Sequence, residues 1–149
     1  MSAAALPEGY AISDDPARLD LDVIHRFIGE SSYWAQGIPR AVLERALRHS
    51  LCWGVYAGAA QVGFARVTTD RATFAYLADV FILPDHRGRG LSKALVAAIL
   101  AHPELQGLRR WMLVTADAQS LYQSFGFTPV AKPERYMEIH RPGIYRQGA

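Results

Sequence analysis

Residues 80–95 decide the fold, and they read Val-Phe-Ile-Leu-Pro-Asp-His-Arg-Gly-Arg-Gly-Leu-Ser-Lys-Ala-Leu. Strand-forming residues fill the run up to Leu83, and Pro84 ends it. The apolar spacing from Leu91 to Ala101 then indicates a helix. The stretch therefore predicts a buried strand, a glycine-bearing turn and a helix in direct succession.

The turn itself has the chemistry of an anion site. Backbone N–H groups at a helix start have no partner within the helix, and the helix dipole places partial positive charge on them. Arg87 and Arg89 stand beside those donors, a combination that suits a pyrophosphate. The simpler interpretation is a strand-to-helix turn in which Gly88 and Gly90 only permit unusual backbone angles.

The composition indicates one globular domain. At 149 residues, with 50% hydrophobic and 20% charged residues, the chain can bury a core and is not of the disordered class. A net charge of +2 favours an anionic small ligand but lacks the concentrated basic face of a nucleic-acid binder. The single cysteine, Cys52, lies in an apolar run, which predicts a buried thiol. No apolar run approaches the length of a membrane span and no signal-peptide pattern occurs, so we expect a cytoplasmic protein with no membrane partner.

Hydrophobic periodicity predicts a mixed α/β sheet covered by helices. Helical spacing follows Asp20 and Pro39, and a loop rich in aromatic residues, 31–38, separates these two helices. The predicted strands are 10–13, 51–56, 61–69, 74–83 and 110–115, with a short helix at 119–125 and a closing antiparallel pair at 127–130 and 135–140.

Two motifs resemble signatures of the GNAT acyltransferase superfamily. Residues 87–92, Arg-Gly-Arg-Gly-Leu-Ser, are similar to its acetyl-CoA-binding pattern Arg/Gln-x-x-Gly-x-Gly/Ala, with Ser92 where the family prefers Gly or Ala. Residues 115–127 resemble its C-terminal pattern Asn-x-x-Ala-x-x-Leu-Tyr-x-x-x-Gly-Phe, although Thr115 replaces the asparagine and leaves Asp117 as a polar substitute. Two signatures in the right order are far more specific than either alone. The positions that match the second pattern are Ala118, Leu121, Tyr122, Gly126 and Phe127.

The resemblance implies a fold and an activity. The fold would be the GNAT fold, a mixed and mostly antiparallel sheet flanked by helices, in a single domain spanning residues 1–149. The activity would be that of an N-acetyltransferase that uses acetyl-CoA and no metal, with a primary amine attacking the thioester directly in a ternary complex. The alternative is a non-catalytic acyl-CoA-binding sensor or interaction module on the same fold. The identity of the acceptor, and whether the protein is a monomer or a homodimer, are left open.

The resemblance also assigns the contacts to the cofactor. The strand 74–83 would splay from the strand 110–115, which frees backbone groups for the pantetheine arm and one N–H for the thioester oxygen. The residues with those freed groups are Val80, Phe81 and Ile82. The pyrophosphate would be held by Arg87, Gly88, Arg89, Gly90, Leu91 and Ser92, and Asp117 would add a polar contact.

Tyr122 is the strongest catalytic candidate. The family places a tyrosine here near the coenzyme sulfur, where a phenol with a pKa of about 10 can protonate the departing thiolate. The alternative is a helix residue whose ring packs against the core and whose hydroxyl is hydrated by solvent. Asp79 is the one carboxylate in an apolar strand, so it needs a partner, either a structural donor or a substrate ammonium. Tyr33 and Trp34 lie where the family's variable acceptor wall forms, and they either border the amine or cap the core.

Other functions fit the sequence less well. His86 has a suitable intrinsic pKa for proton transfer, but beside Arg87 in a loop it is expected to be solvated. A Rossmann dinucleotide site would need a third glycine after Gly90, and a P-loop would need the Gly-x-x-x-x-Gly-Lys pattern. The arginines of the turn do not extend into a basic surface, so a nucleic-acid partner is not expected.

Overall fold

The computed structural model describes residues 5–146 and contains a five-stranded sheet with the strands in sequence order. The first four strands are antiparallel, and the last pairs in parallel with the fourth. They are β1 (Tyr10–Ser13), β2 (Leu51–Ala57), β3 (Ala60–Thr69), β4 (Phe74–Ile82) and β5 (Arg110–Leu113). This mixed, mostly antiparallel sheet confirms the predicted fold class, and each strand agrees with its predicted run to within two residues.

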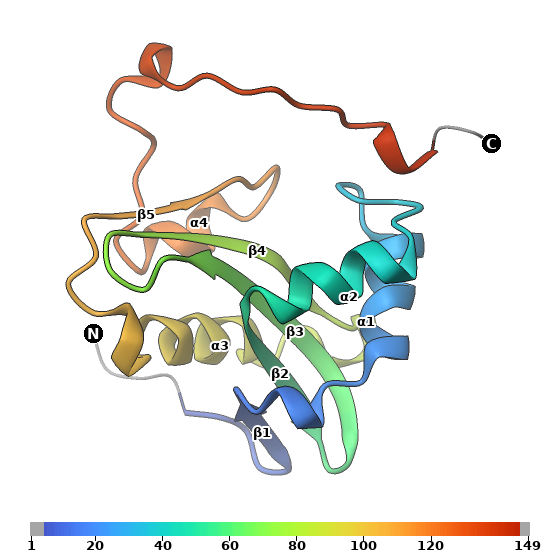
Figure 1. Ribbon diagram of the computed structural model, residues 1–149. Helices are drawn as coiled ribbons and strands as arrows, with labels where there is room; N and C mark the ends of the chain where they lie inside the picture. Colours follow the sequence, from blue (N-terminus) through green and yellow to red (C-terminus); the bar gives the residue numbers. More distant parts are fainter. Residues whose placement is uncertain (1–4, 147–149) are drawn as a thin grey trace.

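Helices cover both faces of the sheet (Figure 1). On one face lie α1 (Leu21–Arg26), which continues into the π-helical turn η2 (Phe27–Ser31), and α2 (Arg40–Arg48). On the other face lie α3 (Leu91–Leu100) and α4 (Gln119–Gln123). α1 begins where the Asp20 carboxylate accepts hydrogen bonds from two backbone N–H groups of the first turn. α3 buries side chains around most of its circumference, which fixes its start firmly against the sheet.

The buried side chains form two clusters, one on each side of the sheet. The larger contains Leu91, Leu95 and Ile99 of α3, and the smaller contains Ile24 and Ile28 from the α1–η2 segment. Cys52 belongs to the smaller cluster, and burial raises the pKa of its thiol to about 12. The prediction of a buried thiol is confirmed, and a thiol held in this protonated state is a poor nucleophile.

β4 is distorted in a way that shapes the cleft beside it. Phe64 of β3 pairs with Phe81, whereas Arg66 pairs with Ala78, so Asp79 and Val80 together face one residue of β3. This β-bulge puts Asp79 at a φ of 56°, a left-handed conformation that aspartate tolerates better than most residues.

Pairing between β4 and β5 ends early. The last paired residues are Leu77 and Leu113, while β4 continues to Ile82. The Leu83 N–H donates to the Val62 carbonyl at 2.8 Å, and because polar groups alternate along a strand, those of Ile82 face away from β3. The end of β4 is therefore unpaired with β5, although the Ile82 carbonyl there accepts a hydrogen bond from Arg87 Nε.

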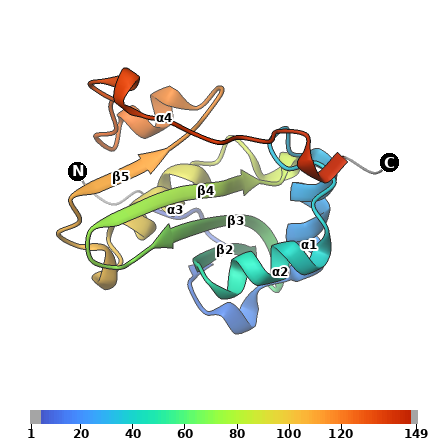
Figure 2. The ribbon, with the colours of Figure 1, turned by 45° about the horizontal axis from the view of Figure 1, so that its top comes forward.

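The predicted closing strands are wrong. The segment 128–146, the C-terminal segment, has only two short 3₁₀ turns, η5 (Pro133–Arg135) and η6 (Ile144–Arg146), and it passes clear of the sheet (Figures 1 and 2). Pro129 removes a backbone N–H donor from the predicted strand 127–130. The predicted strand 135–140 pairs with no strand of the sheet. The segment is attached at two points instead: the Arg110 guanidinium lies over the Tyr136 ring, and Tyr145 packs beside Gly37. A side chain at Gly37 would lie 2.6 Å from the Tyr145 carbonyl oxygen, so this second contact requires glycine.

Candidate active site

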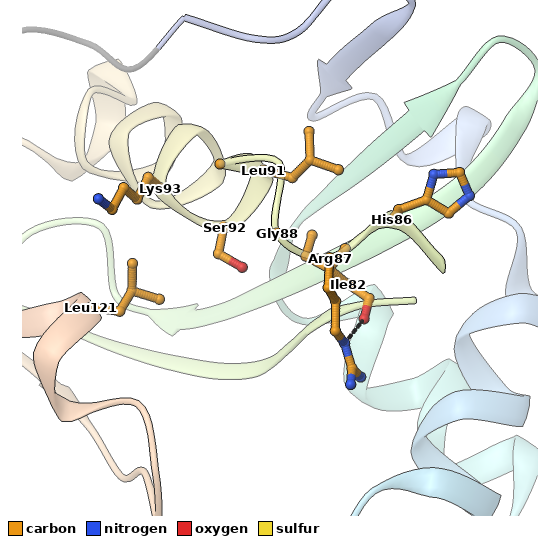
Figure 3. A pocket seen from close by; sticks show the side chains of 9 residues that line it. Ile82, His86, Arg87, Gly88, Leu91, Ser92, Lys93 and Leu121 are labelled. Carbon is orange, nitrogen blue, oxygen red and sulfur yellow. Dashed lines mark hydrogen bonds between the residues drawn. The ribbon is translucent and has the colours of Figure 1, made fainter. Parts of the chain in front are cut away.

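A cavity of about 390 Å³ lies at the turn between β4 and α3. The turn consists of the 3₁₀ turn η3 (Pro84–His86) and the four residues before the helix. Figure 3 shows side chains from the end of β4, the turn, the first turn of α3 and α4 around the cavity. The lining residues are Ile82, His86, Arg87, Gly88, Gly90, Leu91, Ser92, Lys93 and Leu121.

The two glycines give the turn its shape. Gly88 and Gly90 have φ values of 78° and 79°, which only glycine adopts without strain. Gly90 is the N-cap residue of α3, and no side chain of the described residues caps the helix start. Its first backbone N–H groups therefore face the cavity as unpaired donors beside the positive end of the helix dipole. The turn has the geometry that the sequence predicted for an anion site.

The cations around the cavity play different parts. Arg87 donates from Nε to the Ile82 carbonyl at 2.8 Å, which anchors its guanidinium and leaves the terminal nitrogens for a ligand (Figure 3). Lys93 lines the cavity, and sequence reasoning missed it, although its place in the first turn of α3 could have indicated it. Arg89 does not line the cavity and makes only a 3.4 Å contact to the Asp85 carbonyl. His86 is not merely solvated, because its Nδ1 lies 2.7 Å from the Tyr10 hydroxyl.

Tyr122 lies in α4, next to the cavity residue Leu121. Its side chain is 7% exposed, and its ring packs edge-on against Phe127 with centroids 5.9 Å apart. Burial, with smaller effects from Tyr33 and Asp117, raises the pKa of the Tyr122 phenol to about 12. Burial thus keeps the phenol protonated, so it can act as a proton donor.

Asp79 is held by two partners. Its Oδ2 accepts from Arg66 Nε at 2.8 Å, and its Oδ1 accepts from Trp34 Nε1 at 2.8 Å. Arg66 also donates to the Ser50 hydroxyl, which keeps the guanidinium in place. Of the two partners that the sequence allowed for this carboxylate, the structure shows the structural donor.

The loop 32–37 bridges the splayed strands. Trp34 reaches β4 through Asp79, and the Tyr33 hydroxyl accepts from the backbone N–H of Ala116 at 3.1 Å, just after β5. The two rings meet edge-on with centroids 5.0 Å apart. Tyr33 is 58% exposed and Trp34 is 38% exposed, so both offer aromatic surface at the mouth of the splay. The structure thus brings Tyr33, Trp34 and Asp79 together, and Tyr122 lies close enough to Tyr33 for that side chain to affect its pKa.

The remaining predicted positions contribute in other ways. Phe81 turns its side chain into the core, where it stacks on Phe27 with centroids 4.1 Å apart, and its backbone polar groups face its partner Phe64 on β3, so the predicted contact of Phe81 with the cofactor is not supported. Val80 lies in the bulge of β4. Asp117 affects the pKa of Tyr122 and does not line the cavity. Among the described residues no cluster of three metal-ligating side chains occurs, and no helix there is long and apolar enough to cross a membrane.

Comparison with known proteins identifies the family. Residues 48–129, more than half of the chain, match the family model of the acetyltransferase (GNAT) domain. The protein belongs to the GNAT family. As a GNAT protein it is an N-acetyltransferase, as the two motifs predicted.

Individual relatives agree with this GNAT assignment. A candidate acetyltransferase of Gibberella zeae is 36% identical over 135 residues, which cover 76% of this chain and 75% of the relative. The crystal structure of a candidate GNAT acetyltransferase from Xanthomonas campestris pv. campestris is 52% identical, with a TM-score of 0.91 over 95% of this chain and 99% of that chain. A candidate acetyltransferase from Clostridium acetobutylicum, solved with acetyl-CoA, shares the fold at 14% identity and a TM-score of 0.63, over 88% of this chain and 94% of that chain.

Proposed function

We propose that this GNAT enzyme transfers the acetyl group of acetyl-CoA to a primary amine, by direct attack in a ternary complex. The observation that carries the proposal is the continuity of the site: the anion-binding turn leads along the open end of β4 to Asp79, Trp34 and Tyr122. The likeness to the Clostridium acetobutylicum protein solved with acetyl-CoA supports the choice of donor.

Acetyl-CoA, the acetyl donor, is held from the turn before α3 along the end of β4. Backbone N–H groups at the start of α3, helped by Arg87 and Lys93, bind the pyrophosphate. The pantetheine arm follows β4, whose outward backbone groups lack a partner on β5 beyond Leu77. A β4 N–H near the bulge donates to the thioester oxygen as negative charge develops there.

The chemistry then needs a neutral amine and a proton for the leaving sulfur. The amine nitrogen attacks the carbonyl carbon, and a tetrahedral intermediate forms. As the C–S bond breaks, the Tyr122 hydroxyl donates its proton to the departing thiolate, and solvent returns a proton to Tyr122. Asp79 has both carboxylate oxygens engaged, so its role is to position Trp34 in the acceptor wall. The amine loses its proton to solvent.

Measuring thiol release from acetyl-CoA with a panel of primary amines tests the proposal. Initial rates at varied concentrations of both substrates should give intersecting lines, as direct attack requires. Parallel lines would indicate an acetyl-enzyme and contradict the ternary complex. Tight CoA binding without thiol release for any amine would instead support the non-catalytic sensor.

Removing the Trp34 ring should raise the acceptor KM about tenfold and leave CoA affinity unchanged, because the ring borders the amine and not the cofactor turn. The measurement is steady-state kinetics of Trp34→Ala with calorimetry of CoA binding. Trp34→Phe is the matched control: it keeps an aromatic surface, although it loses the hydrogen bond to Asp79 and part of the ring area, and should show a smaller rise in KM. An unchanged KM in Trp34→Ala would remove Trp34 from the acceptor wall.

A further inference from the structure

A second cavity, of about 370 Å³, lies on the other side of the turn that follows β4. The end of α1 and the turn η2 form one wall, and Leu83, Pro84 and Arg87 form the other. Its floor is apolar, with Val23 and Phe27. The polar residues that line it are Arg26, Ser31 and Arg87.

This cavity carries positive charge, which the Asp22 carboxylate on α1 offsets only in part. Hydrogen bonding to Arg40 lowers the pKa of Asp22, and Arg26 contributes to that lowering but forms no ion pair with Asp22. No carboxylate is among its lining residues, and within residues 5–146 neither arginine forms an ion pair. Arg87 is already oriented by its Nε hydrogen bond to the Ile82 carbonyl. Two arginines and a serine beside an apolar floor match a carboxylate or phosphate group attached to an apolar body.

The cavity adjoins the proposed acceptor wall. The ring of Phe27 stacks on Phe81 of β4, and its centroid is 6.5 Å from that of Trp34. Ser31 is the last residue of η2 and stands two positions before Tyr33 in the same loop. A ligand whose amine lies beside Trp34 therefore has this cavity next to it.

We infer that this cavity binds the carboxylate or phosphate group of the acetyl acceptor, and that the acceptor is an amine carrying such an anionic group. The inference rests on the proposed function for its amine end. Asp79, whose carboxylate bonds to Trp34 of the acceptor wall, is already neutralised by Arg66, so it is not free to bind a second ammonium group. Arg26 supplies positive charge instead, while Arg87 lines both cavities and is shared with the pyrophosphate, and this positive charge disfavours a polyamine.

A binding experiment that does not depend on turnover tests this inference. Protein saturated with CoA is titrated by calorimetry with para-(aminomethyl)benzoate and with para-methylbenzylamine, two amines that differ in the carboxylate. The carboxylate compound should bind at least about tenfold more tightly, since hydrogen bonds to charged groups contribute about 1.5–3 kcal/mol. Arg26→Gln should abolish that difference. Arg45→Gln removes an exposed arginine from α2 and is the matched control that should preserve it.

The outcomes distinguish the two ligands that could occupy the cavity, the acceptor and the 3′-phosphate of CoA. Equal affinity for the two amines in the native protein would overturn the inference, as would an unchanged preference in Arg26→Gln. A loss of affinity for CoA but not for dephospho-CoA in Arg26→Gln would assign the cavity to the 3′-phosphate of the donor, and would also overturn it. Because binding is measured directly, a protein that shows the preference but releases no thiol would disprove the transferase proposal and leave the anion subsite intact.

Discussion

Replacing Gly90 with valine should weaken CoA binding by at least about a hundredfold. Gly90 has a φ of 79°, and a β-branched residue is strongly disfavoured in that conformation. An added Cβ would meet no protein atom within 4 Å, so the side chain would project into free space beside the cavity. Backbone rearrangement and steric obstruction would together remove several hydrogen bonds to phosphate, each contributing about 1.5–3 kcal/mol. Calorimetry with CoA measures the loss.

The control for this variant must have the same backbone strain away from the site. Gly107 has a φ of 70° with no atom within 4 Å of an added Cβ, and it lies beyond the opposite end of α3. Gly107→Val should therefore lower the melting temperature about as much as Gly90→Val and leave CoA affinity unchanged. Native affinity in Gly90→Val, or an equal loss in both variants, would mean that the turn does not bind the pyrophosphate.

The local features of the fold could be predicted from the sequence. The strand, turn and helix of residues 80–95 follow from an apolar run, a proline and two glycines, all of which act on the nearby backbone. The cavity at that turn could be placed for the same reason. The closing strands were predicted wrongly. Alternating apolar and polar residues show that a segment is able to form a strand, but not that a neighbouring strand pairs with it.

Contacts between segments that are distant in the sequence could not be predicted either. The composition of β4 showed that Asp79 needs a partner, but the bulge that turns it toward Arg66 and Trp34 depends on register with β3. The second cavity was missed because Arg26 and Arg87 belong to unrelated segments that only the tertiary fold brings together. The motif of residues 87–92 pointed Arg87 to the pyrophosphate, and Arg26 has no local signal beyond its charge.

Substituting Tyr122 with phenylalanine should lower kcat by about a hundredfold, the usual contribution of a general acid. The ring and its packing against Phe127 remain, and only the hydroxyl is lost. CoA affinity should barely change, because Tyr122 does not line the cavity at the helix start. Tyr56→Phe is the matched control: this buried tyrosine donates to the Arg18 carbonyl, its pKa is also raised by burial, and kcat should not change.

The pH dependence distinguishes an acid from a packing residue. Because burial raises the pKa of Tyr122 to about 12, the phenol remains protonated over the whole range in which the protein can be assayed. In the native enzyme kcat should rise with pH as the acceptor ammonium loses its proton, with no fall from Tyr122 until the pH approaches that pKa. In Tyr122→Phe the curve should keep its shape and lie about a hundredfold lower throughout. Full kcat in this variant, with the chemical step rate-limiting, would make Tyr122 a packing residue and leave the departing thiolate without a protein acid.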